Sequence, residues 1–144
     1  RSGRAAAAKV LRASFTDARD EVAIEYAAAY TVPALKSLVR TLAFDRVRNV
    51  LTVSDRIVCT APTAFEVPVI TYRTWRKNAA ATAFTFDKSA TTQRKLEMAV
   101  TASAPVRFRE ERIENPSRPD VQRLAFAFEA PVTEATFTTT FSVR

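Results

Sequence analysis

Apolar and polar residues alternate along most of the chain, and this pattern predicts β-strands. The clearest case is residues 21–26, where Val22, Ile24 and Tyr26 fall on one face and acidic or small residues fall on the other. A period of two is the signature of a half-buried strand. On this pattern and on β-branched and aromatic enrichment, further strands are predicted at residues 7–15, 37–46, 50–60, 63–75, 81–86, 95–103, 106–113, 124–128 and 137–143.

The segment 27–42 is ambiguous. Its apolar residues follow the helical spacing i, i+3, i+4, i+7 from Leu35 to Leu42, and Pro33 could begin a helix. The same stretch also alternates as a strand from Leu38 to Phe44. We predict a short turn near residues 27–34, followed by a strand.

The turns must form almost without glycine, because the chain contains one glycine in 144 residues. Tight hairpins usually need a residue that accepts positive φ, and asparagine is the best substitute for glycine there. We therefore expect longer loops, or Asn49, Asn78 and Asn115 in that role. Asn49 would close a hairpin loop at residues 47–49, and a turn is predicted at residues 76–78.

About ten strands at a spacing of roughly 8–14 residues are typical of an antiparallel sandwich or barrel. We predict an all-β fold, an antiparallel β-sandwich, in one domain that spans residues 1–144. Pro68 has no backbone N–H, so it predicts an edge strand or a bulge at that point.

The net charge of +7 and the pI of about 10.2 suit an anionic partner. Nucleic acid, acidic polysaccharide and anionic lipid all meet that description, and so does a basic surface with no partner. We expect no nucleic acid, because the chain has no reading helix, zinc ligand set or RNP-like aromatic motif. We also expect no membrane span, because no apolar run approaches roughly 20 residues.

The absence of histidine removes the usual general base and the commonest metal ligand. With a single cysteine as well, we expect no zinc site. A Ser-His-Asp triad and a Cys-His pair are excluded within this chain, because both need histidine. Cys59 follows Ile57 and Val58, and we interpret it as a small buried hydrophobic residue. No catalytic residue, metal site or cofactor is predicted.

A candidate binding site for acidic sugars lies at Tyr72, Arg73, Trp75 and Arg76. An aromatic ring beside guanidinium groups can stack on a sugar while the cations meet sulfate or carboxylate. The alternative, which we favour, is a strand end with one buried aromatic residue and solvated charges.

Two further groups of charges are interpreted as structural. Arg40 and Asp55 would lie on neighbouring strands of one hairpin and pair across it. A second group would form an exposed face that compensates its own charge, with three arginines opposed by three glutamates: Arg107, Arg109 and Arg112 against Glu110, Glu111 and Glu114.

A run of short motifs then suggests a family. The strand and turn at residues 25–35, from Glu25 through Ala-Ala-Ala-Tyr to Pro33, are followed by Arg40 and Phe44-Asp45-Arg46 and then by Val53-Ser54-Asp55-Arg56-Ile57. Over about residues 3–75 the chain resembles the C-terminal β domain of heparinase II/III-like polysaccharide lyases. One departure is Thr31-Val32-Pro33, where that family more commonly has Tyr-Pro directly.

The resemblance implies a parent enzyme with an N-terminal α/α toroid and a central β domain, periplasmic or secreted and bacterial, that cleaves uronate-containing polysaccharide such as glycosaminoglycan by β-elimination. The family's catalytic residues lie upstream of this stretch, so this chain alone would be an inactive, non-catalytic C-terminal domain. Tyr30 matches a family position, and we interpret it as packing at the turn. The start at Arg1, without methionine, agrees with a fragment of a longer chain.

Its expected partners are the toroid and the central β domain of the parent, with acidic polysaccharide as a further candidate. The alternatives are a basic carbohydrate-binding β-sandwich and a purely structural one.

Overall fold

The computed structural model describes residues 7–88, 93–116 and 119–143. Within them the chain forms eleven β-strands and one short 3₁₀ helix, η1 (Ala27–Ala29). The strands are β1 (Lys9–Phe15), β2 (Arg19–Glu25), β3 (Leu35–Asp45), β4 (Val50–Thr63), β5 (Glu66–Thr71), β6 (Trp75–Lys77), β7 (Ala83–Phe86), β8 (Leu96–Ala102), β9 (Val106–Ile113), β10 (Val121–Phe128) and β11 (Val132–Val143).

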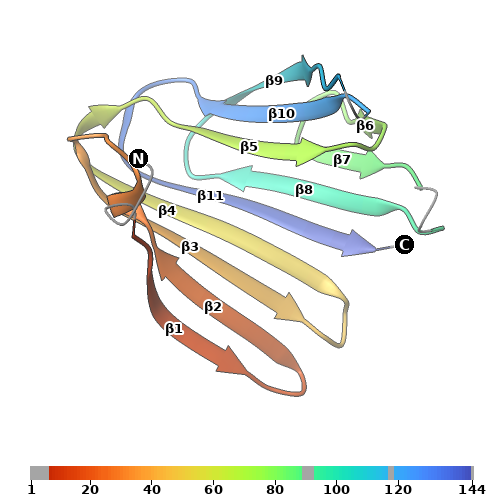
Figure 1. Cartoon of the computed structure of the whole chain (residues 1–144), viewed down its shortest axis with the longest axis horizontal. Coiled ribbons are helices and arrows are strands. Elements are labelled where there is room, and N and C mark those ends of the chain that lie inside the picture. The colour runs from red at the N-terminus through yellow and green to blue at the C-terminus, as the bar shows by residue number, and fades with distance from the viewer. Residues whose placement is uncertain (1–6, 89–92, 117–118, 144) are drawn as a thin grey trace.

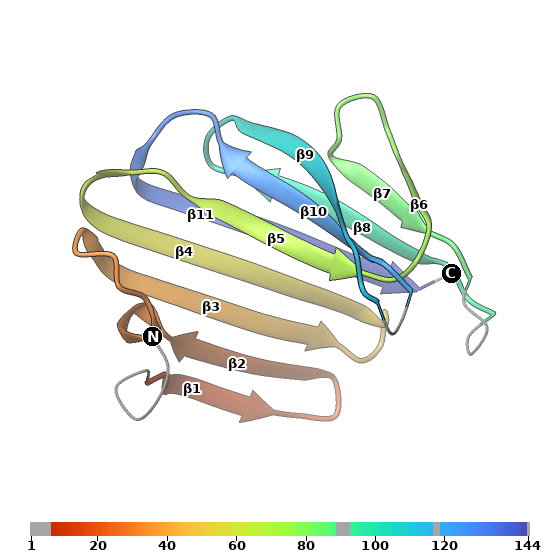
Figure 2. The same ribbon diagram turned by 45° about the horizontal axis from the view of Figure 1, so that its top comes forward.

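The strands form two antiparallel sheets. The larger sheet has eight strands in the order β1-β2-β3-β4-β11-β8-β7-β6, and the smaller has three in the order β5-β10-β9 (Figure 1). The smaller sheet lies in front of the β4, β11 and β8 region of the larger one (Figure 2). The predicted all-β sandwich is therefore confirmed, with eleven strands where about ten were expected.

The core lies between the two sheets. Phe126 on β10 is fully buried, and its ring centroid lies 5.5 Å from those of Phe84 on β7 and Phe137 on β11. Cys59 is 8% exposed and belongs to this cluster, as predicted. Alternating apolar residues on strands of both sheets supply the rest: Leu38, Ile57, Val67, Phe86, Met98, Val100, Leu124, Phe128 and Ala135.

The ambiguous segment is a turn followed by a strand. The 3₁₀ turn η1 is followed by β3, which pairs with β2 on one side and β4 on the other. The residues from Val39 to Asp45 pair with β2 on one side and with β4 on the other, and Leu38 is fully buried. Sheet pairing thus outweighs the helical spacing of the leucines.

The single strand predicted at residues 63–75 is wrong. β5 ends at Thr71, and the chain then crosses to the other sheet, where Trp75 begins β6. The Thr71 hydroxyl accepts a hydrogen bond from the Arg73 amide at 3.0 Å, which favours a turn over a continued strand. Residues 76 and 77, predicted as a turn, lie in β6.

The turn residues are partly as predicted. Asn49 has φ 55°, which confirms its left-handed role, but the other non-glycine residue with positive φ among those described is Ala81, at 52°. Asn78 acts instead through its side chain, because its Oδ1 accepts hydrogen bonds from the amides of Thr82 (2.9 Å) and Ala83 (3.2 Å). Asn115 does not have positive φ either. Pro68 lies on β5, an edge strand, as predicted.

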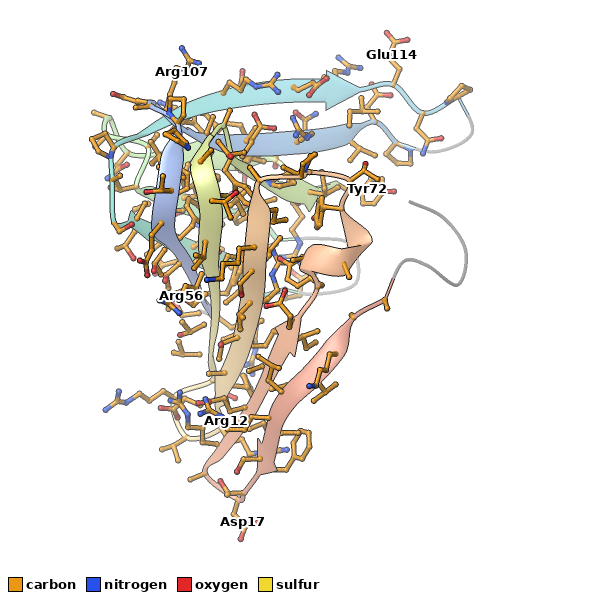
Figure 3. The ribbon with its side chains drawn as sticks, turned by 90° about the vertical axis from the view of Figure 1, so that its left-hand side faces the viewer. Arg12, Asp17, Arg56, Tyr72, Arg107 and Glu114 are labelled. Atoms are coloured by element: carbon orange, nitrogen blue, oxygen red, sulfur yellow. The ribbon has the colours of Figure 1, made fainter. Side chains whose placement is uncertain are left out.

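The larger sheet extends well beyond the smaller one. In Figure 3, β1, β2 and the lower part of β3 extend below the three-stranded sheet, and Asp17 lies at the tip of the β1–β2 hairpin. Nothing else among the described residues is layered against them (Figures 2 and 3). The sandwich is therefore two layers thick over part of its width and one layer thick over the rest.

Candidate functional site

The predicted sugar site is assembled only in part. Tyr72, Arg73 and Trp75 line one hollow of about 290 Å³, together with Thr74 and Gln122. Tyr72 is 59% exposed and presents an aromatic ring at the rim. Arg73 is held at the backbone carbonyl of Asp87, 3.5 Å from its Nη1. The hollow is thus lined by the exposed Tyr72, by Trp75 and by Arg73.

Trp75 belongs mainly to the sandwich core. Its ring centroid lies 5.7 Å from that of Phe108, edge to face, and 5.9 Å from that of Phe84. The indole is partly buried, so only part of it faces the hollow. This agrees with the structural interpretation of Trp75 that we favoured from the sequence.

Arg76 does not line the hollow. Alternation along β6 turns it to the opposite side from Trp75, and its Nη2 forms an ion pair with Asp87 Oδ1 at 3.2 Å. The same Asp87 carboxylate accepts a hydrogen bond from the Thr74 hydroxyl at 3.0 Å. The structure thus brings together three of the four predicted residues and leaves their role in binding as a prediction.

A second cluster, Tyr26, Arg40 and Asp55, lies where β2, β3 and β4 meet the edge of β5. Arg40 donates two hydrogen bonds to Asp55, from Nε to Oδ1 and from Nη2 to Oδ2, both at 2.7 Å. The Tyr26 hydroxyl donates to Asp55 Oδ1 at 3.1 Å. Asp55 is only 2% exposed, so these partners compensate a buried carboxylate. The predicted Arg40–Asp55 pair is confirmed.

Electrostatics fix the protonation states of this cluster. Burial, and next the Asp55 charge, raise the pKa of Tyr26 well above its usual value. The hydrogen bonds to Asp55 raise the pKa of Arg40. At neutral pH the Tyr26 phenol therefore stays protonated and the Arg40 guanidinium stays charged. These protonation states suit a structural role better than the role of a general base.

Tyr26 was missed as a partner of Asp55 in the sequence. The signal was present in the alternation, because Val22 and Ile24 share a face of β2, Ile24 lies opposite Arg40, and Tyr26 continues the same alternation directly after the strand. Beside Tyr26, the Tyr30 ring lies 5.9 Å away and is 47% exposed. Both tyrosines line a hollow of about 240 Å³ beneath β5.

Glu25 anchors the turn that carries Tyr26 and Tyr30. Its carboxylate accepts hydrogen bonds from the Ser37 hydroxyl (2.6 Å) and from the amides of Ala27 (2.9 Å) and Leu38 (3.1 Å). Burial raises the pKa of Glu25, but these three hydrogen bonds outweigh it and lower the pKa overall. Through Glu25, the turn that carries Tyr26 and Tyr30 is therefore hydrogen-bonded to β3.

The arginines of the three-stranded sheet compensate charge locally, as predicted. Arg109 Nη1 lies 3.8 Å from Glu111 Oε2, one of the expected partners, and the other pairs involve residues outside the predicted group. Arg109 Nη2 pairs with Glu66 at 3.1 Å, and Arg123 pairs with the same carboxylate. Arg112 pairs with Asp120. Arg107 projects outward from β9 (Figure 3). This face is therefore no continuous basic track.

Part of the basic excess lies outside the described residues. Four of the 22 lysines and arginines are Arg1, Arg4, Arg118 and Arg144, which leaves 18 basic against 15 acidic residues, a net charge of +3. The described residues thus carry +3 of the chain's net charge of +7.

Within the part of the chain that the structure describes, no group of three potential ligand residues is placed to hold a metal ion. No helix among those residues is long and apolar enough to cross a membrane.

No family model matches this sequence, and no curated protein matches it. Its structure, in contrast, is similar to solved polysaccharide lyases. A heparinase III superposes with a TM-score of 0.78 at 8% identity, over 95% of this chain and 21% of its own. Heparan sulfate lyase HepC from Pedobacter heparinus gives 0.72 at 13% identity, over 94% and 21%. Another heparinase III structure gives 0.70 at 13% identity, over 95% and 21%.

The chain spans about a fifth of the length of these solved structures. At 8–13% identity the likeness concerns the arrangement of the strands and not the side chains of a site. The β-sandwich of this chain therefore has the fold of one portion of heparinase III.

Proposed function

We propose that this chain is the non-catalytic C-terminal β-sandwich of a heparinase II/III-like polysaccharide lyase. Its parent would cleave uronate-containing polysaccharide by β-elimination. The observation that carries the proposal is the likeness to heparinase III over 95% of this chain, at a TM-score of 0.78. The sequence motifs at residues 25–57 support it independently of the fold.

The chemistry of this chain suits a supporting role. β-Elimination next to a uronate needs a base for the C5 proton and groups that neutralise the carboxylate. The chain has no histidine and three tyrosines, and the Tyr26 hydroxyl donates to Asp55 with a raised pKa. The guanidinium of Arg40 is already held by the same carboxylate. The catalytic groups would then come from other parts of the parent.

The proposed partners are the parent's own toroid and central β domain, and the proposed location is the periplasm or the exterior of the cell. Both follow from the resemblance.

An activity measurement on two proteins tests the proposal. The parent and the 144-residue chain are each incubated with heparin, heparan sulfate, hyaluronan and alginate, and the ultraviolet absorbance of the unsaturated uronate is followed. We expect product with the parent on at least one glycan and none with the 144-residue chain alone. A parent inactive on every glycan would reject the lyase assignment, and an active 144-residue chain would reject the non-catalytic role.

A second candidate function is binding of an acidic glycan at the hollow beside Tyr72. The exposed ring of Tyr72 and the neighbouring Arg73 favour it. Titration of the chain with heparan sulfate oligosaccharides at low and high salt tests this, because binding through charges weakens with ionic strength. Tyr72→Ala should abolish the binding, and Tyr30→Ala, which removes another exposed tyrosine, should leave it intact. A flat titration of the unmodified chain would eliminate the candidate.

A further inference from the structure

One face of the larger sheet is covered by the smaller sheet over part of its width and is uncovered over the rest. The face that carries Leu38, Ile57 and Phe137 is buried under the three-stranded sheet. The strand pairing continues this face across β4, β3, β2 and β1, where none of the described residues covers it (Figure 3). We call this part the uncovered face. It consists of Val10, Ala13, Phe15, Asp20, Val22, Ile24, Leu42, Phe44, Leu51 and Val53.

The uncovered face has the composition of a core. Nine of its ten residues are apolar, and Val10 and Phe15 are 59% and 69% exposed. The exception is Asp20, which lies beside Phe15 and Phe44 and forms an ion pair with Arg46 at 2.7 Å. The opposite face of the same strands is more polar and holds Glu21, Thr41, Thr52 and Ser54. A sheet that is solvated on both faces would carry polar residues on both, and a contiguous apolar patch marks an interaction surface.

The free edge of β5 borders this face but is poorly suited to take another strand. Pro68 lies in the middle of β5 and has no N–H to donate. The pairing of β5 with β10 passes through Pro68 without a shift in register, as expected when the proline faces the free edge. A strand added there would lack one ladder bond, so whatever covers the uncovered face packs on it through side chains.

We propose that the uncovered face is the contact surface for another layer of the parent polypeptide, which packs apolar side chains against β1, β2, β3 and β4. This inference rests on the proposed function, in that it treats the chain as one part of a longer heparinase-like protein. The length of the solved lyases indicates what covers the uncovered face. The solved lyases that share this fold are about five times as long as the part that this chain matches, so such a protein supplies a further layer from its own chain.

Thiol labelling compares the same positions in the 144-residue chain and in the parent. In each protein Cys59 is replaced by alanine, and single cysteines are introduced by Val22→Cys and Val53→Cys on the uncovered face. Thr52→Cys is the matched control, because Thr52 neighbours Val53 on the same strand, points to the opposite face and is also partly exposed. We expect labelling at positions 22 and 53 to be at least about tenfold slower in the parent, as for a site that must open before it reacts. Position 52 should label at the same rate in both proteins.

Equal rates at positions 22 and 53 in the two proteins would overturn the proposal. Labelling that slows as the concentration of the 144-residue chain rises would identify a second copy as the occupant and overturn it as well. The same parent samples are assayed for unsaturated uronate. If positions 22 and 53 are protected in the parent but no unsaturated uronate forms, the contact surface is upheld and the lyase chemistry is rejected. If unsaturated uronate forms but the two positions are not protected, the lyase chemistry is upheld and the contact surface is rejected.

Discussion

Arg40 on β3 and Asp55 on β4 form a two-pronged ion pair across the strands, with both N···O distances at 2.7 Å. Asp55 is almost completely buried, whereas the Arg40 side chain is 39% exposed. The pair lies at the boundary between the covered and the uncovered part of the larger sheet. It allows a carboxylate to lie beside the core, because the guanidinium and the Tyr26 hydroxyl satisfy both of its oxygens.

Removing the arginine should destabilise the fold. Arg40→Met leaves Asp55 buried with Tyr26 as its remaining side-chain partner, and we expect a loss of about 2–3 kcal/mol in the free energy of unfolding, below the full cost of breaking a buried pair because Arg40 is partly exposed. Urea unfolding measures it. Arg56→Met, which breaks an exposed pair with Glu134 on the opposite face of β4, should cost about 0–1 kcal/mol. Equal losses in the two variants would contradict a structural role specific to Arg40.

Tyr26 should make the fold sensitive to alkali. Burial and the Asp55 charge raise the pKa of Tyr26 above its usual value of 10.0, so the unfolded chain loses this proton before the folded one. The stabilisation is complete below pH 10 and declines as the pH rises above it. Tyr26→Phe should weaken the dependence of urea unfolding on pH between about pH 9 and about pH 11. Tyr72→Phe, at an exposed ring, should leave that dependence unchanged, and a Tyr26→Phe curve parallel to that of the unmodified chain would refute the assignment.

Glu66 should contribute to acid sensitivity. Burial raises its pKa, but the hydrogen bonds from Arg123 and Arg109 outweigh burial and hold the pKa below the usual 4.5. The stability that Glu66 provides is therefore present above pH 4.5 and is lost as the pH falls through its lower folded-state pKa. Glu66→Gln should lower Tm near neutral pH and flatten its decline in acid. Glu110→Gln, at an exposed residue on β9, serves as the control, and identical acid profiles for the two variants would exclude this role.

Trp75 should matter for stability whether or not a glycan binds. Its ring packs against Phe84 and Phe108, so Trp75→Ala should cost about 2–4 kcal/mol, somewhat less than for a fully buried tryptophan. Trp75→Phe keeps most of the aromatic contact and should cost less. The Tm of each variant in thermal unfolding distinguishes the two losses of stability. A Trp75→Ala chain as stable as the unmodified one would show that the ring faces solvent.

Local alternation was sufficient to predict the sandwich, because each strand has its own apolar face and the turns between strands carry polar residues. It failed where the determining contacts are distant. The crossing from β5 to β6 keeps an alternating pattern while the chain changes sheets, so residues 63–75 look like one strand. The pattern also marks Val22 and Leu42 as inward-facing, but it does not say that nothing among the described residues covers them.

The candidate sites also divide into contacts that the local pattern predicts and contacts that it does not. The Arg40–Asp55 pair was predictable, because hairpin register brings those two residues opposite each other. Tyr26 joins them from the residue that follows β2, and Arg123 and Arg109 reach Glu66 from two other strands. Such partners depend on the order of strands in the sheets, which alternation does not encode.

If this chain supports a lyase without supplying its catalytic groups, its tyrosines are dispensable for the reaction that the parent catalyses. The chain has no histidine, so its three tyrosines are its candidates for the base that takes a proton in such an elimination. The measurement is kcat of the parent with Tyr26, Tyr30 and Tyr72 all changed to phenylalanine, on the glycan that the unmodified parent cleaves and under conditions where both remain folded. We predict a kcat within about twofold of the unmodified parent, whereas loss of a general base would lower it by about 100-fold or more and contradict the claim.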